Sequence, residues 1–126
     1  MAQRIGPDEW QHEAGQNADM ERAIAVSRRT VGSTGLYSSV VTTRPGGTSR
    51  VHHHGDCETS IYVMSGRARF SWGTTGTEES FEAETGDIVY IPAHELHVEE
   101  NASPTDDLVV LVTRNCDDAV TIYPEP

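Results

Sequence analysis

The sequence contains no lysine, so its nine basic side chains are all arginines, set against 20 acidic residues. The formal net charge is −11. Binding to the phosphates of DNA or RNA requires clustered Lys and Arg side chains, and docking on an anionic membrane surface has the same requirement. We therefore expect neither a nucleic acid nor a membrane as a partner.

Cysteines and long apolar runs are also scarce. Cys57 and Cys116 are the two cysteines, too few for a disulfide framework. No segment approaches the roughly 18 apolar residues of a membrane span, and the polar N-terminus lacks the apolar core of a secretory signal. These absences predict a cytoplasmic protein with reduced thiols, in which Cys57 is a small, semi-buried side chain.

The remaining sequence reads as one all-β domain. Short segments rich in Val, Ile, Thr and aromatic residues alternate with Gly, Pro, Asn, Asp and Ser, and such spacing is typical of a sandwich or small barrel. We expect an irregular N-terminal arm over residues 1–21 and a β-barrel of about ten short strands over residues 22–126. The expected strands are 22–30, 35–44, 48–54, 58–65, 67–73, 78–83, 87–92, 95–100, 107–114 and 119–123.

Three consecutive histidines stand in the segment "SRVHHHGDCETSIYVMSG", residues 49–66. Because side chains alternate across a strand, His52 and His54 share one face and His53 lies on the other. Two imidazoles about 7 Å apart can share a metal ion if another strand supplies a further ligand. A polar strand end with exposed histidines is the alternative, and this segment alone leaves both open.

A second segment, "GDIVYIPAHELHVEEN", residues 86–101, supplies the missing strand. His94 and His97 follow a strand that ends at Pro92. A histidine in such a turn can close a metal site from a neighbouring strand.

Together the two segments resemble the motifs of the cupins, the double-stranded β-helix or jelly-roll superfamily. The first cupin motif, G-x5-H-x-H-x3,4-E-x6-G, resembles the run from Gly46 through His52 and His54 to Glu58. The second, G-x5-P-x-G-x2-H-x3-N, resembles the run from Gly86 through His97 to Asn101. The resemblance covers roughly residues 22–114 and implies an all-β cupin jelly-roll barrel.

Carried over residue by residue, the resemblance implies four metal ligands: His52, His54, Glu58 and His97. Three imidazoles and one carboxylate suit one divalent transition metal, with Fe, Mn, Ni, Co and Zn all possible. An octahedral ion held by four ligands has two open positions for substrate, water or dioxygen.

Two departures from the motifs affect this assignment. Seven residues separate Glu58 from Gly66, where the motif has six, so counting back from Gly66 places Thr59 at the carboxylate position. Glu58 and Thr59 cannot both face inward on a regular strand, and a bulge over residues 56–60 would turn Glu58 inward. In the second motif His94 replaces a glycine, which predicts that His94 lies at the mouth of the site.

Two further side chains are candidates for catalysis. By alternation Arg50 shares the face of His52, where it would bind a substrate carboxylate or an enolate oxygen; an arginine at the barrel mouth is the alternative. Glu99 shares the face of His97, as a general base or as support for the metal ligands, with a surface acid at a strand end as the alternative.

The resemblance therefore implies a metal-dependent enzyme that acts on a small organic substrate. Oxygenase chemistry ranks slightly ahead of isomerase or cyclase chemistry, because three histidines and one carboxylate are common among cupin dioxygenases. A non-catalytic cupin that binds or senses a small ligand is the alternative. By analogy with cupins, we also expect a homodimer.

Overall fold

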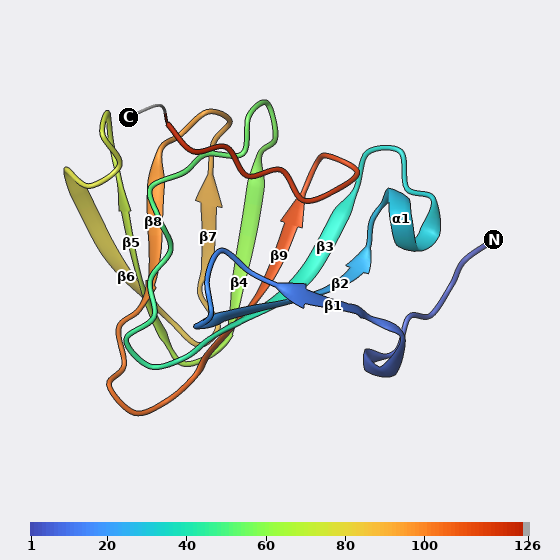
Figure 1. Cartoon of the computed structure of the whole chain (residues 1–126), viewed down its shortest axis with the longest axis horizontal. Coiled ribbons are helices and arrows are strands. Elements are labelled where there is room, and N and C mark those ends of the chain that lie inside the picture. Colours follow the sequence, from blue (N-terminus) through green and yellow to red (C-terminus); the bar gives the residue numbers. More distant parts are fainter. Residues whose placement is uncertain (125–126) are drawn as a thin grey trace.

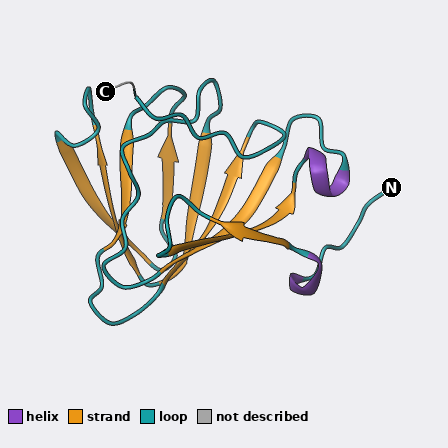
Figure 2. Ribbon diagram, viewed as in Figure 1, coloured by secondary structure: helices purple, strands orange, loops and turns teal. Residues whose placement is uncertain are grey.

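The computed structural model describes residues 1–124, which fold into two antiparallel sheets packed face to face (Figures 1 and 2). The all-β class expected from the sequence is confirmed. The larger sheet has the order β1-β2-β3-β9-β4-β7 and the smaller one the order β6-β5-β8. The strands are β1 (Gln11–Ala14), β2 (Met20–Val26), β3 (Tyr37–Thr43), β4 (Thr59–Ser65), β5 (Arg67–Trp72), β6 (Glu79–Glu84), β7 (Ile88–Ile91), β8 (His97–Asn101) and β9 (Leu108–Arg114).

Two of the expected strands are instead irregular segments. Residues 48–54 and 119–123 form isolated bridges, which include His52 with His97 and His53 with Ile122. Both segments run across one side of the sandwich, in front of the sheets in Figure 1. The segment with the histidines is thus held to β8 and to the C-terminal segment without being part of a ladder.

The N-terminal region is more regular than expected. A short 3-10 helix, η1 (Pro7–Glu9), is followed by β1, which pairs with β2 along four residues. The division into an arm over 1–21 and a barrel over 22–126 stays a prediction, although β1 lies within the expected arm. Residues expected to extend β2 form a helical turn, α1 (Arg28–Val31), capped by Ser27. No helix in residues 1–124 is long and apolar enough to cross a membrane.

Alternating side chains build the core between the sheets. In β9, Leu108, Val110 and Val112 are buried while the residues between them are partly exposed. The same period of two places Ala68 and Phe70 of β5 inside, opposite the larger sheet. Burial of these apolar side chains fixes the register of both sheets, because a slip by one residue would turn the apolar set outward.

Candidate metal centre

His52, His54 and His97 meet between the two sheets. His97 opens β8, and its backbone exchanges two hydrogen bonds with that of His52, at 3.1 and 2.9 Å. His52 and His97 are 0% exposed and His54 is 3% exposed. The ring centroids lie 4.2 Å apart for His52 and His97, 4.8 Å for His52 and His54, and 5.1 Å for His54 and His97.

Backbone carbonyls fix the orientation of all three rings. The Nδ1 atom of His52 lies 2.7 Å from the oxygen of Arg50, that of His54 lies 2.6 Å from the oxygen of Val120, and that of His97 lies 2.8 Å from the oxygen of Glu95. A carbonyl oxygen can only accept, so each Nδ1 carries the proton. Each Nε2 is therefore unprotonated and has a lone pair that can bind an ion, as in metal sites whose histidines donate through their other nitrogen.

Glu99 adds a carboxylate to the three imidazoles. It stands two residues after His97 in β8, and its Oε1 lies 3.4 Å from the Nε2 of His97. One ligand atom from each of the four residues lies within 4.8 Å of the others. Two ligand atoms bound to the same metal ion are at most about 4.4 Å apart. A shift of the side chains by a few tenths of an ångström would therefore let all four bind one ion.

The protonation states of the cluster and its polar atoms without a partner suit a bound cation. Burial lowers the pKa of His52 to about 4, and burial followed by the charge of Arg114 lowers that of His54 to about 2, so both rings are neutral. Burial alone would raise the pKa of Glu99, but its close approach to His97, with smaller effects of the other two histidines, lowers it. Among the described residues, His97 Nε2 and Glu99 Oε1 are buried without a hydrogen-bond partner. Such atoms are costly unless something binds them, and a divalent metal ion fits.

Arg114, the last residue of β9, enters the same space. Its Nε donates to the Thr59 hydroxyl at 3.2 Å, and one terminal nitrogen donates to His54 Nε2 at 3.2 Å. Arg114 is 9% exposed and lines a cavity of about 30 Å³ together with His52, His54 and Glu99. The alternation of buried residues along β9, through Leu108, Val110 and Val112, places Arg114 inside as well.

The structure does not bring Glu58 to this cluster, which corrects the expected ligand set. Glu58 is exposed and accepts from the Tyr90 hydroxyl at 2.6 Å and from Asn115 at 3.2 Å. No bulge turns Glu58 inward, because β4 starts at Thr59. Thr59 is 1% exposed and accepts a hydrogen bond from Arg114. Thr59 thus occupies the position counted back from Gly66, and Glu99 supplies the carboxylate from β8.

Arg50 is also outside the cavity. It is exposed, and its guanidinium carbon lies 3.8 Å from the ring centroid of Tyr123. Alternation fails here because residues 48–54 do not form a regular strand: Ser49 is buried, and a bend at Val51 restores His52 to the interior. The contribution of Arg50 to the cluster is its backbone carbonyl, which orients His52.

Of two other polar side chains, Gln16 lines the cavity beside the cluster and His94 does not. His94 is at the surface, where it adopts a φ of 63° and pairs with Asp56 at 2.7 Å. Gln16, from the turn between β1 and β2, places its amide nitrogen 3.2 Å from His52 Nε2. The sequence contained no signal for Gln16, because the segment around it was expected to be an irregular arm.

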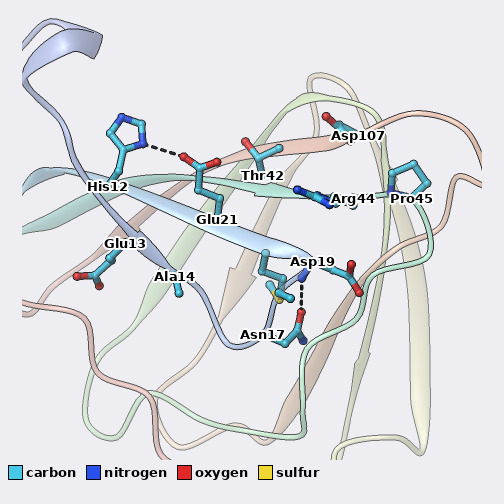
Figure 3. Close-up of a pocket in the computed structure, with 12 residues that line it drawn as sticks. His12, Glu13, Ala14, Asn17, Asp19, Glu21, Thr42, Arg44, Pro45 and Asp107 are labelled. Atoms are coloured by element: carbon cyan, nitrogen blue, oxygen red, sulfur yellow. Dashed lines mark hydrogen bonds and ion pairs between the residues drawn. The ribbon is translucent and has the colours of Figure 1, made fainter.

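A larger hollow of about 650 Å³ lies at the surface beside β1 and β2. Figure 3 shows its polar lining, in which His12 faces Glu21 at 2.8 Å and Asp19 bonds to Asn17. None of the residues that line this hollow belongs to the buried cluster. Met20 lines both spaces, so the β1–β2 hairpin forms the wall between them.

Two packed antiparallel sheets that enclose three histidines and a carboxylate define a small β-sandwich with a candidate metal site inside. The chain belongs to the cupin family: the profile described as Cupin domain matches residues 39–114. That range contains all four clustered residues and Arg114. The family expected from the two histidine motifs is confirmed.

The individual proteins to which this chain is similar are oxalate decarboxylases. A probable oxalate decarboxylase of Arthroderma benhamiae is 32% identical over 77 residues, which are 60% of this chain and 19% of the relative. A structure of Bacillus subtilis oxalate decarboxylase that concerns its Mn(II) centres is 27% identical, with a TM-score of 0.76 over 88% of this chain and 29% of the other. The formate complex of Lactobacillus farciminis oxalate decarboxylase superposes with a TM-score of 0.78 at 18% identity, over 92% of this chain and 34% of the other, and shows the fold alone. The chain thus spans about a third or less of the length of these proteins.

Proposed function

We propose that this cupin is a metal-dependent enzyme that acts on a small carboxylate. The observation that carries the proposal is the convergence of three imidazoles and the Glu99 carboxylate, beside a cavity that His52, His54, Glu99 and Arg114 line. His52, His54, His97 and Glu99 would hold one divalent transition metal. A bound ion of this kind supplies Lewis acidity, which polarises a carboxylate oxygen.

Arg114 would bind and orient the substrate carboxylate. A guanidinium pairs with a carboxylate through two parallel N–H donors, and the Thr59 hydroxyl fixes its Nε. The N–H that donates to His54 Nε2 becomes available to substrate once that lone pair is used by a metal. Burial strengthens this ion pair, because little water competes inside the cavity.

The cavity limits the size of the substrate. Its volume of about 30 Å³ has room for only two or three water-sized groups. Gln16 and Met20 of the β1–β2 hairpin line it, so bulk water is largely excluded. A substrate the size of oxalate or formate suits this space better than a large organic molecule, and the oxalate decarboxylase relatives support the same substrate class.

Decarboxylation is therefore favoured over the oxygenase chemistry that ranked first in the sequence. The test begins with metal analysis of protein purified without an affinity tag, beside His97→Ala and, as a matched control, Glu58→Ala. We expect a stoichiometric transition metal in the parent and in Glu58→Ala, and none in His97→Ala. Absence of metal from the parent after reconstitution with Mn(II) or Fe(II) would contradict the proposal.

The metal-loaded parent is then incubated with oxalate while carbon dioxide, formate and dioxygen are measured. Release of carbon dioxide and formate without net dioxygen consumption is the expected result. Stoichiometric dioxygen consumption would instead support an oxygenase. Saturable binding of oxalate without turnover would support the non-catalytic binding cupin, and isomerase or cyclase chemistry would leave oxalate unchanged and unbound.

We also propose that the chain forms a homodimer through the outer face of β4 and β7. Four apolar side chains are exposed there: Tyr62 at 41%, Met64 at 44%, Ile88 at 69% and Tyr90 at 60%. Clustered exposed apolar side chains commonly mark interaction surfaces. Sedimentation should show a dimer for the parent and a monomer for Ile88→Glu; a monomeric parent would contradict this. The cytoplasmic location stays a prediction from the sequence.

A further inference from the structure

The two cysteines lie opposite each other just beyond the paired ends of β4 and β9. These strands are antiparallel, with Thr59 opposite Arg114 and Ser60 opposite Thr113. Each step toward the strand ends moves one residue back in β4 and one forward in β9. Residue 58 therefore faces 115, and Cys57 faces Cys116.

The intervening pair holds this register beyond the strands. The backbone nitrogen of Asn115 donates to the oxygen of Glu58 at 3.4 Å, and the side-chain oxygen of Asn115 accepts from the backbone nitrogen of Glu58 at 2.7 Å. This makes residues 58 and 115 the hydrogen-bonded pair, so the cysteines form the next, non-hydrogen-bonded pair. Cα atoms in such pairs are about 4.5 Å apart, within the range of about 4.4–6.8 Å that a disulfide spans.

The state of the thiols agrees with this placement. Both cysteines are free, Cys57 is buried and Cys116 is partly exposed. Burial raises the pKa of Cys116 to about 12, and the neighbouring Cys57 thiol contributes in the same direction. The Cys116 thiol donates to the backbone oxygen of Asp118 at 3.5 Å. Thiol–disulfide exchange at Cys116 is slow because little thiolate is present near neutral pH.

We propose that Cys57 and Cys116 form a reversible disulfide in the folded protein. The oxidant is a small disulfide such as oxidised glutathione. One cysteine first forms a mixed disulfide and releases one reduced thiol; the second cysteine displaces the other thiol and closes the S–S bond. The two protein thiols lose two electrons and two protons, and one small disulfide becomes two small thiols.

The disulfide would connect two segments of the candidate metal site. The backbone nitrogen of Cys57 donates to the oxygen of His54 at 3.1 Å, and Cys116 stands two residues after Arg114. A covalent bond here restrains the loop of His54 against the strand of Arg114. This restraint slows the opening that a bound ion needs in order to leave. The effect on metal release rests on the proposed metal site, whereas the disulfide itself does not.

The test equilibrates the folded parent with mixtures of reduced and oxidised glutathione over a range of ratios, followed by alkylation and non-reducing peptide mass mapping. Both thiols should disappear together, with one peptide pair joined through Cys57 and Cys116. Cys57→Ser and Cys116→Ser are matched controls, and each should give only a mixed disulfide with glutathione. Separate glutathione adducts in the parent, or a crosslink that forms only after unfolding, would overturn the proposal.

Two further readouts compare the oxidised and reduced parent. The crosslink should raise Tm by roughly 10 °C, since it restrains the unfolded chain. After loading with Mn(II), the oxidised parent should release the ion to a chelator more slowly, and the oxidant should have no such effect on Cys116→Ser. Equal release rates with a complete crosslink would refute the restraint of the site while leaving the disulfide established, and no metal uptake in either state would refute the metal site instead.

Discussion

Two groups of histidines lie side by side in the sequence but in different environments. His52, His54 and His97 are buried, with each Nδ1 held by a backbone carbonyl. His53 and His94 lie outside, with ring centroids 6.0 Å apart, and His94 pairs with Asp56, whose side chain is 98% exposed. Both groups combine imidazoles with a carboxylate.

The contrast between the buried and the exposed histidines shows that residue type alone does not produce a site able to bind a metal ion. Backbone carbonyls orient the rings of the inner group, and its histidines are buried between the two sheets. The outer pair can exchange its hydrogen bond for water at little cost. Burial and fixed tautomers are therefore the properties that separate a site able to bind an ion from a polar surface.

Removal of an inner histidine should have the largest effect. For His97→Ala we expect metal affinity to fall by more than the roughly 100-fold that loss of a supporting hydrogen bond costs, because a ligand itself is lost. Metal analysis after dialysis measures this. His94→Ala is the matched outer change and should retain the metal; equal loss in both variants would show that the comparison is wrong.

Replacement of Glu99, the carboxylate of the cluster, by glutamine should have the next largest effect, and Glu58 provides the matched comparison. Glu99→Gln removes the charge from the cluster, and we expect metal affinity to fall by about 10- to 100-fold. Glu58→Gln should retain affinity and lose at most about 1 kcal/mol of stability from its hydrogen bonds at the surface. Titration calorimetry with Mn(II) distinguishes the two, and the reverse order would restore Glu58 as the ligand.

Acid should weaken the metal-free fold through the inner histidines. The pKa of His52 is lowered from 6.5 to about 4 by burial, so the unfolded chain binds a proton before the folded one does. Stability is therefore full above pH 6.5 and declines as pH falls toward 4, by roughly 3 kcal/mol from this group. Urea unfolding at several pH values measures the slope.

His52→Asn should reduce this slope while the contribution of His54 remains, and the outer variant His94→Gln should retain the full slope. A parent whose stability is constant between pH 6.5 and 4 would show that the buried rings are not neutral.

The smallest effect is expected at His94 itself. Its φ of 63° is a left-handed conformation, which costs a residue with a side chain about 1 kcal/mol or more compared with glycine. His94→Gly relieves this strain but loses an exposed ion pair worth less than about 1 kcal/mol. We expect a gain of a few tenths of a kcal/mol in urea unfolding, with metal content unchanged; a clear loss would mean that the pair with Asp56 outweighs the strain.

The fold and three of the four residues of the inner cluster could be predicted from the sequence. Alternation of apolar residues and turn signals gave the all-β class, and the spacing of His52, His54 and His97 brought them together. Glu58 was wrong because the first motif allows two counts, and only the start of β4 at Thr59 decides between them. Glu99 was expected as a general base or as support for the metal ligands, with a surface acid as the alternative, and the structure places it within the cluster.

The other errors arise where the chain leaves regular structure. Arg50 was placed inside by strand alternation, which the bend before His52 interrupts. Gln16 reaches His52 through a hairpin whose turn carries no periodic signal. Contacts of this kind depend on how distant segments pack, so local patterns in the sequence do not contain them.

The three carbonyls that hold the rings come from residues 50, 95 and 120, in three separate segments. Every residue type carries the same carbonyl, so the side chains at these positions can change freely without disturbing the tautomers. Side-chain substitutions at residues 50, 95 and 120 therefore leave the hydrogen bonds that orient the histidine rings in place. Such a centre can drift far in sequence, or acquire new side chains around its mouth for a different substrate, while its inner geometry stays intact.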